Sequence, residues 1–180
     1  MRLFLAAELP ESVKQNLFLQ TKKLREEFPY FRWIPAQNYH ITLLFFGNVN
    51  GGNEKRIIQQ IDRAVYDLPL FRLYSGPIDI FIRSSIALYL GFQKNKVIED
   101  IVKKIKKEMN IQDTLKFFPH LTLARYRVPS KQQYLVIKKK CRQFDVDIQF
   151  EIPQITLFDS VIENKKPIYK VVERFPLLSE

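Results

Sequence analysis

The chain has 180 residues, of which 46% are hydrophobic and 27% charged, and its formal net charge is +10 at pH 7. This composition excludes a disordered chain, and no uninterrupted apolar stretch approaches the ~20 residues that a membrane-spanning helix needs. The positive charge favours a polyanionic or phosphorylated partner, such as RNA, although a lysine-rich surface also serves solubility alone.

The first half of the chain predicts alternating strands and helices. Val13, Leu17 and Leu24 recur at helical intervals, and Pro29 and Pro35 end that helix. In chain order we expect a strand over 2–9, one helix over 11–27, a strand that carries His40 and ends at Gly47-Asn48, a loop over 50–53, and a helix capped by Asn53 that runs to about Asp67.

The second half, like the first, contains a helix followed by a strand that carries a histidine. We expect strands over 71–76 and 78–82 interrupted by Gly76-Pro77, a turn at Ser84-Ser85, and a strand over 86–92. A helix over 96–109, a strand over 117–125 and a helix over 131–141 should follow. The chain should end with strand material over 145–158 and a final strand over 167–174. This order indicates two related lobes with an approximate internal duplication. No linker rich in Pro, Gly or Ser separates the halves, so we expect a single two-lobed domain over 1–180.

The two histidines of the chain open the same four-residue pattern, His40-Ile41-Thr42-Leu43 and His120-Leu121-Thr122-Leu123. In a strand, residues i and i+2 point to the same face, so each imidazole should share a face with a threonine hydroxyl. The residues between them should turn to an apolar face. A single strand histidine is usually a structural residue, but the repeated pattern favours a paired function.

Paired general acid–base catalysis fits this pattern best. Zinc catalysis usually needs three or four ligands at short spacings, which the sequence lacks, and no Gly-x-Ser-x-Gly motif suggests a nucleophilic triad. An imidazole titrates near ~6.5, so one histidine can act as a base and the other as an acid near neutral pH. Phosphodiester cleavage needs this division, with hydroxyls and a cation to hold the phosphate oxygens.

Three further residues are candidates with alternatives left open. Arg125 lies five residues after His120, an offset that puts it on the opposite face of a regular strand, so a bulge or bend after Ala124 would be needed to aim it at the site. Trp33 could stack on a base or be a buried structural residue. Cys141 could have a pKa lowered by the neighbouring lysines, although an inert cysteine is the more common case.

The sequence resembles the two-histidine phosphoesterase superfamily, and within it the RNA 2',3'-cyclic phosphodiesterases, also called 2'-5' RNA ligases. The likeness covers essentially the whole chain. It rests on the two His-x-Thr motifs and on similar segments that begin at Met1, Arg32, Pro119, Ile155 and Pro167.

The resemblance implies an α+β, bilobal LigT-like fold in which two antiparallel sheets form a central V-shaped cleft, with helices packed outside. It implies hydrolysis of RNA 2',3'-cyclic phosphate ends to 2'-phosphomonoesters without a metal or other cofactor, and it allows reversible 2'-5' RNA ligation. Carried over by position, His40 is the proton donor and His120 the proton acceptor, while Thr42, Thr122 and Arg125 bind the substrate phosphate.

Two other functions stay open from the sequence. The chain could be a non-catalytic module that binds RNA ends, or a cyclic phosphodiesterase that acts on a small nucleotide. The expected partners are RNA with 2',3'-cyclic phosphate termini, including tRNA fragments, or cyclic nucleotides. The apolar run before Glu8 is too short for a signal peptide, so we expect a cytoplasmic protein without a membrane partner. We also expect a monomer.

Overall fold

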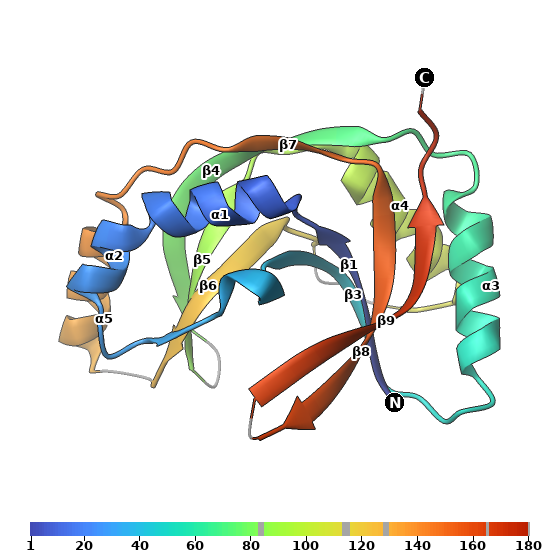
Figure 1. Cartoon of the computed structure of the whole chain (residues 1–180), viewed down its shortest axis with the longest axis horizontal. Coiled ribbons are helices and arrows are strands. Elements are labelled where there is room, and N and C mark those ends of the chain that lie inside the picture. The colour runs from blue at the N-terminus through green and yellow to red at the C-terminus, as the bar shows by residue number, and fades with distance from the viewer. Residues whose placement is uncertain (83–84, 113–115, 128–129, 165, 180) are drawn as a thin grey trace.

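Two antiparallel sheets form the framework of the protein in a computed structural model that describes residues 1–82, 85–112, 116–127, 130–164 and 166–179. The four-stranded sheet contains, in spatial order, β3 (His40–Asn48), β1 (Arg2–Glu8), β8 (Gln154–Glu163) and β9 (Lys166–Pro176). The five-stranded sheet contains β2 (Arg32–Trp33), β6 (His120–Tyr126), β5 (Ile86–Phe92), β4 (Phe71–Ile82) and β7 (Gln149–Ile152). The sheets splay apart from the place where they meet, as Figure 1 shows.

Each sheet contains one histidine strand, as the resemblance implied. The strands β3 and β6 are neighbours in space although they belong to different sheets. We call the face of each sheet that carries its histidine the inner face. The core lies on the other side of the strands and takes buried residues from both sheets, for example Leu5 of β1 and Leu88 of β5.

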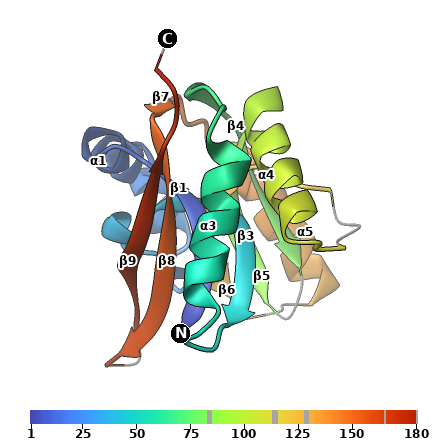
Figure 2. The same ribbon diagram turned by 90° about the vertical axis from the view of Figure 1, so that its right-hand side faces the viewer.

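Helices pack outside the sheets. Their bounds are α1 (Glu11–Gln20), α2 (Lys22–Glu27), α3 (Glu54–Val65), α4 (Lys96–Glu108) and α5 (Lys131–Cys141), with a 3₁₀ turn η1 (Ala36–Asn38) before β3. Helices α3 and α4 pack side by side (Figure 2), and α5 contacts β4. In the described part of the chain, no helix is long and apolar enough to cross a membrane.

Several predicted elements differ from the observed ones for identifiable reasons. The single helix predicted over 11–27 is wrong: it divides into α1 and α2 at Thr21, whose hydroxyl donates a hydrogen bond to the Leu17 carbonyl at 2.7 Å. Asn53 occupies the N-cap position of α3, as predicted, but its side chain makes no capping hydrogen bond.

The strands predicted on either side of Gly76-Pro77 are one continuous strand, β4, with a register shift between Ser75 and Ile78. One part of β4 pairs with β7 and the other mainly with β5. The strand predicted from 117 begins instead at His120, and the predicted 145–158 material forms β7 and β8. Ser84, half of the predicted turn, lies outside the described residues.

Candidate active site

In each His-x-Thr motif the threonine lies on the same inner face as the histidine, as the spacing predicted. The side chains of His40, Thr42, His120 and Thr122 are half-buried. The motif residues between and after them, Ile41, Leu43, Leu121 and Leu123, are all buried in the core. The alternation of a polar inner face and an apolar outer face is thus confirmed at both motifs.

The two imidazoles are held in the same way. Nδ1 of His40 lies 2.7 Å from the carbonyl oxygen of Asn38, and Nδ1 of His120 lies 2.8 Å from the carbonyl oxygen of Phe118. A carbonyl only accepts hydrogen bonds, so Nδ1 must carry a proton in each ring. In the neutral form the lone pair is therefore on Nε2, and Nε2 is the atom that gains or loses a proton.

The hydroxyl of Thr42 is the immediate partner of one of these nitrogens. Its Oγ1 atom lies 3.1 Å from Nε2 of His40. A hydroxyl can donate to neutral Nε2 or accept from a protonated Nε2. The contact is therefore compatible with both protonation states of His40.

A β-bulge follows each threonine. In the pairing of β5 with β6, Tyr89 lies opposite Thr122 and Leu88 lies opposite Ala124, so Leu123 has no partner. The extra residue shifts the alternation by one position. Arg125, opposite Ala87, consequently shares the inner face with His120 and Thr122.

Arg125 therefore lies on the inner face, but the bulge that places it there is at Leu123, before Ala124 and not after it. The first motif has the matching irregularity: Ala6 lies opposite Thr42 and Leu5 opposite Leu44, which leaves Leu43 without a partner. The internal duplication thus extends to the backbone distortion in both lobes.

The two bulges make Phe45 the counterpart of Arg125. Both residues lie five positions after a motif histidine and on an inner face. The side chain of Phe45 is 69% exposed, and its ring centroid lies 6.0 Å from that of Phe4. Sequence reasoning missed Phe45, although counting five residues from each histidine would have pointed to it.

The surroundings of His40 shift its pKa in opposite directions. Burial lowers the pKa of His40, and the positive charges of His120 and Lys14 lower it further. The hydrogen bond to the Asn38 carbonyl and the negative charge of Glu8 raise it, but less than burial lowers it. The charge of His120 therefore acts on His40 across the two sheets.

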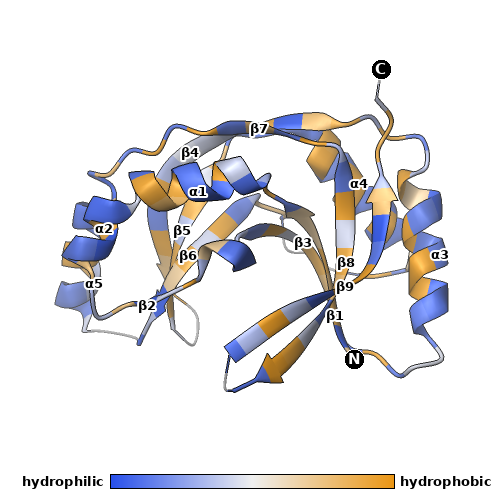
Figure 3. Cartoon of the chain, in the orientation of Figure 1, coloured by the Kyte–Doolittle hydropathy of each residue, from blue (hydrophilic) through white to orange (hydrophobic). Residues whose placement is uncertain are grey.

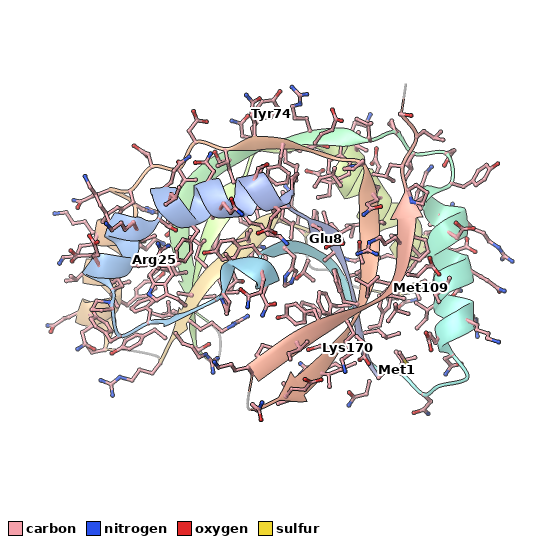
Figure 4. The ribbon with its side chains drawn as sticks, in the orientation of Figure 1. Met1, Glu8, Arg25, Tyr74, Met109 and Lys170 are labelled. Atoms are coloured by element: carbon pink, nitrogen blue, oxygen red, sulfur yellow. The ribbon has the colours of Figure 1, made fainter. Side chains whose placement is uncertain are left out.

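Glu8 is a second residue that sequence reasoning missed. It lies opposite His40 in the pairing of β1 with β3, in the space between the two sheets (Figure 4). Its carboxylate accepts a hydrogen bond from Oγ1 of Thr156 at 2.6 Å, and Nε of Arg174 lies 3.9 Å away. These contacts fix a negative charge beside the imidazole of His40.

Aromatic rings surround both histidines. The ring centroids of Phe4 and Tyr169 lie 5.1 and 5.2 Å from that of His40. The rings of Tyr89 and Phe118 lie 5.6 and 5.9 Å from His120. These contacts restrict the orientation of each imidazole and partly exclude water.

Tyr169 also links the two sheets. Burial raises the pKa of its phenol, while the positive charge of Arg125 acts to lower it. Because Tyr169 belongs to β9 and Arg125 to β6, this interaction crosses from one inner face to the other. The five site residues predicted from the sequence are therefore gathered in one region between the sheets.

The other sequence candidates have structural roles. Burial raises the pKa of the Cys141 thiol to about 12, so the lysines beside it do not activate it. Nε1 of Trp33 donates a hydrogen bond to the Phe28 carbonyl at 3.0 Å, and the ring packs against the core. The described residues contain no group of three or more His, Cys, Asp or Glu side chains arranged to hold a metal ion.

Comparisons with known proteins agree with this geometry. A family model described as the 2'-5' RNA ligase superfamily matches residues 10–161. The chain belongs to the 2'-5' RNA ligase superfamily. A member from Methanocaldococcus jannaschii, named RNA 2',3'-cyclic phosphodiesterase, is 28% identical over 97% of this chain and all of its own length. A relative with the same name from Thermotoga maritima is 25% identical over 96% of this chain and 93% of its own.

Solved structures place this superfamily member in a known fold. The crystal structure of Escherichia coli LigT complexed with 3'-AMP superposes with a TM-score of 0.78 at 21% identity, covering 99% of this chain and 98% of LigT. Kluyveromyces marxianus Usb1 with uridine monophosphate superposes with a TM-score of 0.65 at 13% identity. The α+β, bilobal LigT-like fold expected from the resemblance is therefore confirmed.

Proposed function

We propose that this superfamily member hydrolyses the 2',3'-cyclic phosphate at the 3' end of RNA to a 2'-phosphomonoester by general acid–base catalysis. The observation that carries the proposal is the pair of imidazoles, each fixed through Nδ1 by the carbonyl two residues earlier, with Nε2 left to exchange the proton. The activity named for the relatives from Methanocaldococcus jannaschii and Thermotoga maritima supports the choice of substrate.

In this mechanism Nε2 of His120 accepts a proton from water while the water oxygen attacks phosphorus. Nε2 of His40 donates a proton to the ribose 3' oxygen as the bond from phosphorus to that oxygen breaks. The product is a 2'-phosphate with a free 3'-hydroxyl. The hydroxyls of Thr42 and Thr122 donate to phosphate oxygens, and the guanidinium of Arg125 balances the charge that develops there. The same step with an RNA 5'-hydroxyl in place of water would break the bond from phosphorus to the 3' oxygen and form a 2'-5' bond.

The donor role of His40 depends on the substrate. Its lowered pKa favours the neutral imidazole in the free protein, which would suit a base better than an acid. A bound phosphate adds negative charge near the ring and favours the imidazolium. Glu8 acts in the same direction, so the substrate and Glu8 together counter the effect of burial.

Glu8→Gln is expected to move the alkaline limb of the kcat/KM profile to lower pH and to reduce kcat/KM several-fold at neutral pH. The amide oxygen can still accept the Thr156 hydrogen bond, but the charge that raises the pKa of His40 is lost. A lower pKa means that the protonated form of His40 disappears at a lower pH. The check is the pH profile of both proteins, with Glu8→Asp as the variant that keeps the charge. An unmoved alkaline limb in Glu8→Gln would contradict this role.

Phe45→Ala is expected to raise KM for 2',3'-cyclic AMP by about tenfold, because a base stacked on an aromatic ring is stabilised by ~1–3 kcal/mol. The exposed ring of Phe45 on the inner face is well placed to stack on the terminal base. Phe45→Tyr should keep most of the affinity. Tyr66→Ala, which removes an exposed ring just after α3, is the control. An equal KM for Phe45→Ala and the wild type would remove Phe45 from the base site.

The product of 2',3'-cyclic AMP hydrolysis tests the proposed function itself. We expect 2'-AMP, formed at an unchanged rate when a chelator is present. Formation of 3'-AMP would mean that the bond from phosphorus to the 2' oxygen breaks, which would contradict the proposed leaving group. Binding of RNA ends without turnover would instead support the non-catalytic module, and turnover of cyclic nucleotides but not of RNA ends would support a small-molecule phosphodiesterase.

A further inference from the structure

Two arginines lie directly opposite each other at the edge of the five-stranded sheet. In the pairing of β2 with β6, Arg32 is opposite Arg125, and both side chains are exposed. Directly opposed residues of an antiparallel pair share a face, with Cα atoms about 5 Å apart. Arg32 therefore stands beside Arg125 on the inner face, at the strand that Figure 3 labels β2.

This arrangement costs stability unless an anion is present. Like charges directly opposite each other on neighbouring strands repel. Among the described residues, neither Arg32 nor Arg125 has a carboxylate within ion-pairing distance, whereas Arg72 and Arg142 each pair with one. Two adjacent guanidinium groups without an acidic partner are typical of a site for a polyanion.

The surrounding chain has the same sign of charge. The segment over 116–144, which includes β6 and α5, contains no Asp or Glu. Its eight cationic residues are Lys116, Arg125, Arg127, Lys131, Lys138, Lys139, Lys140 and Arg142. Lys140 and Arg142 pair with Glu27 and Asp79, and the remaining cationic residues of this segment favour the approach of a nucleic acid chain from that side.

We propose that Arg32 binds the phosphodiester immediately 5' to the terminal nucleotide of an RNA substrate, beside the cyclic phosphate held by Arg125. This inference rests on the proposed function. A 2',3'-cyclic phosphate stands at the 3' end of a strand, so the nearest additional phosphate is the one that joins the terminal nucleotide to its 5' neighbour. Arg32 would then distinguish an RNA end from a cyclic mononucleotide, which has no such phosphate.

The test compares 2',3'-cyclic AMP with a tetraadenylate that ends in a 2',3'-cyclic phosphate. Arg32→Gln is expected to raise KM for the tetranucleotide about tenfold at low salt, the effect of losing one charged hydrogen-bonding contact. It should leave kcat/KM for 2',3'-cyclic AMP unchanged. The slope of log kcat/KM against log salt for the tetranucleotide should become shallower by about 0.7.

Two variants control for charge. Arg32→Lys should keep most of the tetranucleotide affinity, and Arg56→Gln, which removes an exposed arginine from α3, should behave like the wild type. Thermal unfolding of Arg32→Gln should occur no lower than that of the wild type, because the repulsion from Arg125 is relieved.

Equal losses on both substrates would overturn the inference, since Arg32 would then act at the terminal phosphate. An unchanged KM for the tetranucleotide would overturn it as well. If Arg32→Gln does not fold, the inference can be tested on the wild type alone. The tetranucleotide must then have a lower KM and a steeper salt dependence of kcat/KM than 2',3'-cyclic AMP. Failure of the proposed function is distinguishable, because the wild type would then not hydrolyse the tetranucleotide, whether or not it hydrolyses 2',3'-cyclic AMP.

Discussion

Replacing either histidine by asparagine is expected to lower kcat/KM for 2',3'-cyclic AMP by about 100- to 10,000-fold, the usual contribution of a positioned acid or base. In His40→Asn and His120→Asn the side-chain amide can still donate to the carbonyl of Asn38 or Phe118, as Nδ1 does. What the substitution removes is Nε2. The loss should therefore reflect proton transfer and not a disordered strand, which circular dichroism and thermal unfolding would verify.

The double variant should be little worse than either single variant, because groups that act together in one step are strongly non-additive. The wild-type profile of kcat/KM against pH should be bell-shaped, since one imidazole must be neutral and the other protonated. Near-normal turnover by a folded His40→Asn or His120→Asn protein would remove that residue from the proposed mechanism. Retained binding of 2'-AMP by the inactive variants would separate catalysis from affinity.

Arg125→Ala is expected to lower kcat/KM by about 100- to 1,000-fold, the range observed when a group that stabilises the transition-state charge is removed. The bulge at Leu123 turns this guanidinium to the inner face, where its charge also acts on Tyr169. Arg125→Lys should recover only part of the loss, because an ammonium cannot form the two parallel hydrogen bonds of a guanidinium.

Arg127→Ala is the matched control for Arg125→Ala. Arg127 lies just after β6, and its Nε donates a hydrogen bond to the Tyr126 hydroxyl at 3.2 Å. Its removal deletes the same charge two residues away. Similar effects of the two substitutions would mean that net charge, and not the position of Arg125, accounts for the loss.

Local patterns in the sequence predicted the parts of the site that local geometry determines. The shared face of His40 and Thr42 follows from strand alternation, and α5 has the predicted bounds because Ser130 and Gln133 form a capping box at its start. The break at Thr21 was not predictable from apolar spacing, because it arises from a side-chain hydrogen bond to the backbone.

Most of the residues that were missed depend on strand pairing. Glu8 and Tyr169 reach His40 from strands distant in sequence, so no spacing rule connects them. The two-residue strand β2 lies between prolines and shows no periodicity of its own, which hid the position of Arg32 opposite Arg125. The position of the bulge at Leu123 likewise emerges only from the pairing with β5.

The matching bulges have a consequence for the direction in which a substrate can lie. The two motifs present the same imidazole, the same hydroxyl and the same distortion from opposite sheets, so this part of the scaffold alone would accept a ligand in either of two orientations. The two halves of the site differ at the residue five positions after each histidine, which is the aromatic Phe45 in one half and the cationic Arg125 in the other. Under the proposed mechanism, we therefore expect Phe45 and Arg125 to help determine the direction of the bound strand and, with it, which ribose oxygen leaves.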